Sequence, residues 1–252
     1  MKKKNGWVPD QHGAWVMVLV PIIVGVILRP SWIQVPLFIA WMSGYFAFFA
    51  LSLFLKVRSP RRRRYVPALG AYGGVSACFS LAIVLLQPSL LWFAFVFGPL
   101  VAVAVWEAYR RRPRSLLSGI STVLASCAML PVAFFAAGGN PRDVWVPTLI
   151  MAMYFCGTIP YVKTLIRKKG DAHWLFGSVA YHILCVIAMA ILFAIKLSPW
   201  WGIVIFALFA FRAWWVPHSA GSRRAWSPRD IGIGEMFSTA ALLAIVFAVS
   251  VA

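Results

Sequence analysis

The sequence predicts an all-α fold: a polytopic bundle of about nine transmembrane helices in a single domain over residues 1–252. The first observation behind this is composition, since the chain is 62% hydrophobic and 12% charged, whereas soluble domains carry about 25% charged residues. The second is that the apolar residues form long runs with basic clusters between them. This is the positive-inside pattern of membrane proteins. We therefore expect no nucleic-acid binding, despite a formal charge of +18.

Nine apolar segments approach the roughly 20 residues that a helix needs to cross the hydrocarbon core. They cover residues 14–28, 32–55, 66–86, 89–109, 116–137, 145–166, 173–195, 199–217 and 231–251. The first is short and a tight turn, Arg29-Pro30-Ser31, follows it, so the first two helices should form a hairpin. No small-residue cleavage site follows the lysine-rich start, so we expect the first helix to be retained.

The basic residues predict the orientation of these segments. Of the 24 Lys and Arg residues, all but Arg29, Arg142 and Lys196 lie on one side of the arrangement. Arg212 is counted here with the loop between the eighth and ninth segments. The asymmetry predicts a cytoplasmic N-terminus and, with nine spans, an external C-terminus.

Each of the four cysteines falls in a different apolar run, without CxxC or Cys/His spacing. We therefore expect apolar packing residues rather than a zinc site or disulfides. Neither a metal nor a cofactor is predicted.

Charged groups within a span are costly and usually face a bundle interior or a water-filled cavity. Glu107 lies about one turn inside the end of its segment, where an intrahelical pair with Arg110 or Arg111 and a role in a site are the two alternatives. Glu235 lies in the first turns of the last segment, where the helix dipole favours a carboxylate. It has no basic partner at helical spacing, which makes it the stronger candidate.

The histidines form a second set of candidates. His12 and His173 fall at cytoplasmic helix starts, and His12 belongs to the polar stretch Asp10-Gln11-His12-Gly13. His182 lies about nine residues deeper, roughly 13 Å at 1.5 Å per residue. For His182, a hydrogen bond to a neighbouring helix and a functional role are equally consistent with the sequence.

The segment 145–166 carries one polar face at helical spacing, formed by Tyr154, Thr158, Tyr161 and Thr164. This face leads into Lys163 and Arg167. A tyrosine-rich wall that ends in a cationic rim suits an amphiphile with an anionic head group. The alternative is that these cations only set the topology and contact anionic lipid.

Three motifs resemble one known family. They are Pro9-Asp10-Gln11-His12-Gly13-Ala14-Trp15, Tyr161-Val162-Lys163-Thr164-Leu165-Ile166-Arg167 and Ile231-Gly232-Ile233-Gly234-Glu235. Together they resemble the YwiC-like family of bacterial membrane proteins over essentially the whole chain. The resemblance implies a multi-pass protein of the bacterial cytoplasmic (inner) membrane and supplies no activity.

The predicted topology is also distantly similar to that of UbiA-type prenyltransferases. The segment from Arg61 to Pro67 lies where those enzymes have a basic, proline-containing segment. Their Asp-rich motifs, which would hold Mg²⁺ through oxygen ligands, have no counterpart here. Asp171 stands alone among cations. Similar topology does not transfer activity.

The sequence therefore predicts a cavity, open to the cytoplasmic side, that binds an amphipathic or anionic small molecule or a lipid. The alternatives are a metal-independent or degenerate prenyltransferase with an isoprenoid ligand, a small-anion or lipid transporter, and a purely structural role. Membrane lipids are expected partners. The sequence does not identify whether the protein has a protein partner. The candidate ligand-binding residues are Asp10, His12, Arg61, Arg64, Glu107, Tyr154, Thr158, Tyr161, Lys163, Arg167, His173, His182 and Glu235.

Overall fold

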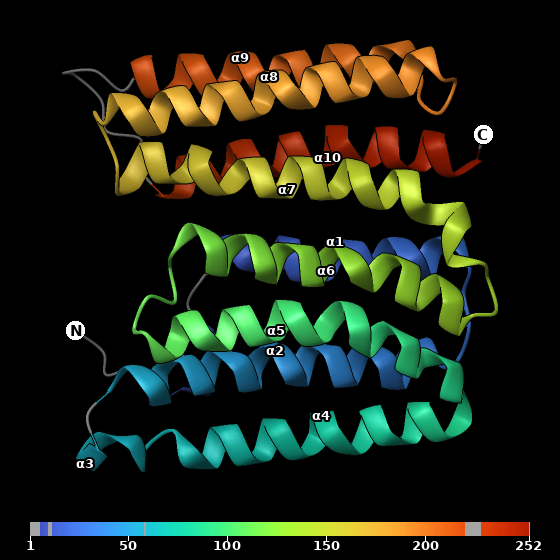
Figure 1. Cartoon of the computed structure of the whole chain (residues 1–252), viewed down its shortest axis with the longest axis vertical. Helices are drawn as coiled ribbons and strands as arrows, with labels where there is room; N and C mark the ends of the chain where they lie inside the picture. The colour runs from blue at the N-terminus through green and yellow to red at the C-terminus, as the bar shows by residue number, and fades with distance from the viewer. Residues whose placement is uncertain (1–5, 10–11, 58, 220–227, 252) are drawn as a thin grey trace. The chain divides into compact units, whose positions relative to one another are not determined.

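A computed structural model describes residues 6–9, 12–57, 59–219 and 228–251, and these residues form helices and turns without a strand. The chain divides into two compact units, Met1–Val144 and Trp145–Ala252, called unit 1 and unit 2 below. Figure 1 shows unit 1 from blue to green and unit 2 from yellow to red. The predicted all-α class is confirmed.

Eight helices of the described chain are long and apolar enough to cross a membrane, which makes this a multi-pass membrane protein. Their residues are Gln34–Lys56, Val66–Leu86, Pro88–Tyr109, Leu116–Ala136, Pro141–Ile166, Ala172–Ala194, Trp200–Ser219 and Asp230–Ser250. The helix that corresponds to the first predicted segment is shorter, with 17 residues. The orientation across the membrane stays a prediction.

Unit 1 contains five α-helices of 16 to 23 residues and three short helices. In chain order they are α1 His12–Leu28, α2 Gln34–Lys56, α3 Ser59–Arg62, α4 Val66–Leu86, η1 Pro88–Phe93, α5 Ala94–Tyr109, α6 Leu116–Ala136 and η2 Pro141–Val144. Helix α2 packs against α4 and α5, and α6 packs against α1 and α5. The predicted hairpin partners α1 and α2 touch each other, but each packs more extensively on another helix.

Small residues allow the close approach of these helices. A Cβ on Gly25 of α1 would lie 2.8 Å from Cβ of Ala133 and 2.9 Å from the carbonyl oxygen of Leu130, both in α6. In the second pair, Ser76 of α4 donates a hydrogen bond of 2.9 Å to the carbonyl of Ala40 in α2. Close backbone packing of this kind is the main source of helix association within lipid.

Side chains reinforce the turn after α1, which also has backbone hydrogen bonds such as that from the N–H of Gln34 to the carbonyl of Ser31 at 3.2 Å. The buried amide of Gln34 accepts from the backbone of Ser31 and donates to the carbonyls of Arg29 and Ala133. Nε of Arg29 donates to the carbonyl of Ala137, at 2.9 Å, just after the end of α6. The carbonyl of Ala133 also accepts from the backbone N–H of Ala137 at 3.3 Å, so the Gln34 amide is its second donor at the end of α6.

Unit 2 consists of α7 Trp145–Ile166, α8 Ala172–Ala194, α9 Trp200–Ser219 and α10 Pro228–Val251. Helix α8 packs against α7 and α9, and α10 packs against α7 and α9. Its fully buried side chains include Phe155, Met189, Phe206 and Leu242. Asp171 caps the start of α8 by accepting from the backbone N–H groups of His173 and Trp174. These helices position the polar groups described next.

Candidate functional site

A partly buried ion pair joins α9 and α10 in unit 2. Nη1 of Arg212 lies 2.7 Å from Oε1 of Glu235, and the two side chains are 16% and 22% exposed. The same nitrogen donates to Oγ of Ser238 at 2.6 Å. The hydroxyl of Tyr154 in α7 donates to Oε2 of Glu235 at 3.0 Å. Both carboxylate oxygens therefore have a donor from another helix.

Aromatic rings surround the guanidinium of this pair. The guanidinium carbon of Arg212 lies 4.4 Å from the ring centroid of Tyr161 and 5.6 Å from that of Phe209. The rings of Tyr154 and Phe209 are themselves 4.8 Å apart. A cation over an aromatic face is stabilised electrostatically, and more so where water is excluded. The aromatic rings thus partly replace the hydration that Arg212 lacks.

Arg212 was predicted as a loop residue, and that prediction is wrong. It lies within α9, seven residues before Ser219, the last residue of that helix. Charge counting assigned it to the loop because the basic residues Arg223, Arg224 and Arg229 follow it. The apolar run 199–217 already contained Arg212, and this was the signal that could have found it.

The predicted polar face of α7 divides into two kinds of residue. Tyr154 and Tyr161, two turns apart, contact the Arg212–Glu235 pair. The hydroxyls of Thr158 and Thr164 instead donate to carbonyls within α7, at 2.7 Å each. These two threonines are buried, and each hydroxyl proton is already donated to a backbone carbonyl.

His182 is buried in α8 beside α7. Its Nδ1 is 2.7 Å from the carbonyl of Ser178. A Cβ on Gly157 of α7 would lie 3.0 Å from its Nε2. The imidazole therefore occupies the space left by a glycine, the arrangement expected of a packing residue, and a ligand role for it stays a prediction.

The predicted cationic rim of α7 is partly engaged with its surroundings. Nζ of Lys163 lies 4.9 Å and Nζ of Lys168 5.8 Å from the ring centroid of Trp174. Lys168 also forms a partly exposed ion pair with Asp171 at 3.6 Å. The backbone N–H of Trp174 lowers the pKa of Asp171, assisted by Lys168. Arg167 and His173 are exposed.

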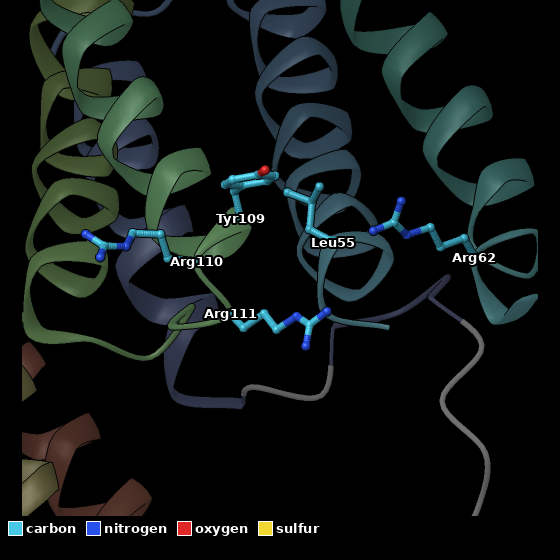
Figure 2. Close-up of a pocket in the computed structure, with 5 residues that line it drawn as sticks. All are labelled: Leu55, Arg62, Tyr109, Arg110 and Arg111. Atoms are coloured by element: carbon cyan, nitrogen blue, oxygen red, sulfur yellow. The ribbon is translucent and has the colours of Figure 1, made fainter. Parts of the chain in front are cut away.

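Unit 1 contains a second candidate site, a hollow at the ends of α2, α3 and α5. It has a volume of about 370 Å³ and is lined by Leu55, Arg62, Tyr109, Arg110 and Arg111. We call it the arginine hollow. Figure 2 shows the side chains of Arg62 and Arg111 extended toward Leu55, while the guanidinium of Arg110 points away from them.

The arginines of the hollow are held by different means. Nε of Arg62 donates to the carbonyl of Val57 at 3.3 Å, and its guanidinium lies 5.2 Å from the ring centroid of Phe54. Arg111 has a φ of 60°, a left-handed conformation that costs a non-glycine residue about 1–2 kcal/mol. Arg111 is the left-handed residue that ends α5: the N–H of Arg112 donates to the carbonyl of Glu107 at 2.8 Å, as in a common helix C-cap.

The other predicted residues of unit 1 do not line this hollow. Arg61 and Arg64 are exposed and lie one residue before and two residues after Arg62 in the chain. Glu107 is buried, and the structure shows no ion pair within 4 Å between it and either Arg110 or Arg111. The intrahelical ion pair that the sequence offered as one explanation of Glu107 is therefore not observed.

The opening stretch of the chain is described only in part. Asp10 lies outside the described residues, and His12 begins α1 with a side chain that also lies outside them. Before it, the carbonyl of Trp7 accepts from the hydroxyl of Tyr72 in α4 at 3.0 Å. After it, the ring of Trp15 lies 5.5 Å from that of Phe46 in α2. Trp7 and Trp15 thus contact α4 and α2 of unit 1, respectively.

The two sites differ in what they can do chemically. The arginine hollow is open and cationic, which suits an anionic group that arrives from outside. The Arg212–Glu235 pair is partly buried and internally balanced, which suits recognition within the bundle. Within the described ranges, no three His, Cys, Asp or Glu side chains are grouped so that they could hold a metal ion.

Comparison with known proteins identifies a matching family but no matching solved structure. The model of a family described as "YwiC-like protein" matches residues 8–134. No solved structure matches the chain.

Two relatives extend this match along the chain. The "Uncharacterized protein YwiC" of Bacillus subtilis (strain 168) is 29% identical over 241 residues, which cover 95% of this chain and 96% of the relative. An "Uncharacterized protein" of Haemophilus influenzae (strain ATCC 51907 / DSM 11121 / KW20 / Rd) is 27% identical over 188 residues, 73% of this chain and 77% of the relative. The multi-pass helical bundle, the family match and the near full-length similarity agree, and the chain belongs to the YwiC-like family.

Proposed function

We propose that the protein binds an amphipathic molecule or lipid with an anionic head group, on the cytoplasmic side of a bacterial cytoplasmic membrane. The observation that supports this function is the arginine hollow. Three of its five lining residues are arginines, beside Leu55 and Tyr109, and the side chains of two of them, Arg62 and Arg111, extend toward Leu55 (Figure 2). Guanidinium groups bind phosphate and carboxylate oxygens through paired hydrogen bonds, and the leucine and tyrosine give a neighbouring apolar contact.

The location of the hollow supports an amphiphile rather than a fully water-soluble anion. It lies at the ends of long apolar helices, where a head group and the start of an acyl chain meet the protein together. The positive-inside prediction assigns these ends to the cytoplasmic face. The half-buried Lys163, the exposed Arg167 and His173, and the polar stretch with Asp10 and His12 remain candidates for additional contacts.

The test must separate a specific site from general attraction to an anionic surface, which contributes about 1 kcal/mol per basic residue. Adjacent arginines provide a matched pair of variants. Arg62→Gln/Arg111→Gln removes two lining residues of the hollow. Arg63→Gln/Arg112→Gln removes the same charge from the next residues in the chain, which do not line it. Both variants remove two positive charges, so they change the positive-inside signal for membrane orientation equally.

Lipid retention is measured by native mass spectrometry after reconstitution in equal phosphatidylglycerol and phosphatidylcholine. We expect wild type and the Arg63/Arg112 variant to retain phosphatidylglycerol preferentially. The Arg62/Arg111 variant should lose most of that preference. Equal loss in both variants would mean general attraction only, and unchanged retention in the Arg62/Arg111 variant would remove the hollow as the site.

Prenyl transfer, with a UbiA-like arrangement, and transport of a small anion or lipid remain alternatives. The first is supported by the predicted topology alone. The second is supported by the basic loops and by His182. Incorporation of an isoprenoid diphosphate by the purified protein would favour the first, and uptake into proteoliposomes would favour the second.

A further inference from the structure

Arg212 of unit 2 has more hydrogen-bond donors than its protein partners use. Nη1 alone contacts Glu235 and Ser238. The Nε and Nη2 atoms are buried and have no hydrogen-bond acceptor in the part of the chain that the structure describes. A buried donor without an acceptor is costly, so these two positions require an explanation.

The two unused donors are arranged as one recognition group. In a planar guanidinium, the N–H of Nε and one N–H of Nη2 point to the same side and form a fork. A fork of this kind matches two oxygens of a carboxylate or a phosphate. A lysine would suffice for the ion pair with Glu235 alone. The fork is what arginine adds.

The surroundings hold the fork in a fixed direction. Glu235 and Ser238 bind one nitrogen of the guanidinium, and the rings of Tyr161 and Phe209 lie against it. Arg212 is seven residues from the end of α9, about 10 Å along the helix axis. The group is thus preorganised inside the bundle and within reach of one membrane boundary.

We propose that Nε and Nη2 of Arg212 bind an oxyanion, a carboxylate or phosphate group, inside unit 2. This site is separate from the arginine hollow and does not depend on its function. Glu235 acts as a competing anion that holds Arg212 when the site is empty. Neutralising Glu235 must therefore strengthen binding, whereas removing the fork must weaken it.

The test uses the full chain, purified in a neutral maltoside detergent at constant ionic strength. Three probes replace chloride: acetate, inorganic phosphate and laurate. Binding is followed by the shift of the thermal unfolding midpoint with probe concentration. Acetate or phosphate binding identifies a free oxyanion as sufficient, and binding of laurate alone identifies the head group of an amphiphile.

Three variants decide the outcome. Arg212→Lys keeps the charge and removes the fork, so the apparent affinity for the active probe should fall by at least about tenfold, equivalent to 1.4 kcal/mol. Glu235→Gln should raise that affinity. Arg114→Lys, in an exposed loop residue, should leave it unchanged. Equal binding by wild type and Arg212→Lys, or no response of wild type to any probe, would overturn the proposal.

A measurement on wild type alone keeps the proposal testable if Arg212→Lys does not fold. A laurate analogue with a photoreactive diazirine beside the carboxyl group is cross-linked to the protein and the labelled peptides are sequenced. We expect the label in peptides that contain Tyr161 or Phe209. An excess of the probe that shifts the unfolding midpoint should reduce this labelling. Label confined to unit 1 would overturn the proposal.

Discussion

In unit 1 the guanidinium groups of Arg62 and Arg111 lie at helix ends around an open hollow, whereas in unit 2 that of Arg212 lies between helices and is paired with Glu235. An arginine at the membrane boundary keeps its hydration and can exchange one anion for another. An arginine inside the bundle must be compensated by the protein at all times. The difference separates cations that attract a ligand from one that also holds the fold together.

The largest expected effect comes from breaking the partly buried pair. Arg212→Leu leaves the partly buried Glu235 without its ion-pair partner, which should lower the free energy of unfolding by about 3–5 kcal/mol. Arg212→Leu/Glu235→Leu should recover much of that loss, because no unpaired charge remains. Arg62→Leu in unit 1 should change stability by about 1 kcal/mol or less. Unfolding in mixed micelles measures all three, and a double variant as unstable as the two single changes combined would contradict the argument.

A smaller effect is expected at the contact between α1 and α6. Gly25→Ala forces a Cβ to within 2.9 Å of the Leu130 carbonyl and 2.8 Å of Ala133. Overpacking of this kind costs about 1–3 kcal/mol. Gly13→Ala is the control in the same helix, since a Cβ there meets nothing within 4 Å. Equal thermal midpoints for the two variants would show that α1 does not depend on this close approach.

Helix caps give the next comparison between the units. In unit 1, Ser115 caps α6 by accepting from the backbone of Ser118, and Ser115→Ala should cost about 1 kcal/mol at every pH. In unit 2 the cap is Asp171, whose folded pKa is lowered by the N–H of Trp174. Its contribution is fully present above its unfolded pKa of about 3.9 and is lost as the pH falls through the lower folded pKa.

Asp171→Asn keeps a capping oxygen without a titrating charge. The stability difference between wild type and this variant should therefore shrink below about pH 4. The corresponding difference for Ser115→Ala should stay constant. A pH-dependent Ser115 difference would show that the acid response does not come from the caps.

The smallest expected effect on stability has the opposite sign. Arg111→Gly relieves the left-handed conformation at φ 60° and should raise the free energy of unfolding by about 0.5–1 kcal/mol. The same variant removes a lining guanidinium and should weaken retention of phosphatidylglycerol. Arg112→Gly is the control, and stabilisation there of equal size would mean that the conformation of Arg111 carries no strain.

The sequence was sufficient for the helices and for part of each site. Apolar runs placed the ends of the long helices within three residues of those observed, except that the run 89–109 begins in the 3₁₀ helix η1 and α5 itself starts at Ala94. Membrane thickness imposes a length that composition reveals. Arguments from helical spacing also identified Tyr154, Tyr161 and Glu235 as candidate ligand-binding residues. Arg212 was missed because its partner is 23 residues away on another helix, and no local spacing encodes that contact. The strain at Arg111 depends on how α5 ends, which the run of arginines does not specify.

The side-chain bonds around the first turn also affect how the protein is made. Gln34 donates to a carbonyl 99 residues later in the chain, and Arg29 donates to one 108 residues later. At translation rates of roughly 5–20 residues per second, α6 emerges about 5–20 s after the first hairpin. During that interval the amide of Gln34 can bond within the turn to Ser31 and Arg29. The donors that later bond near the end of α6 have only water, head groups or the insertion machinery as further partners. The first two helices must therefore wait at the membrane before their final polar contacts can form.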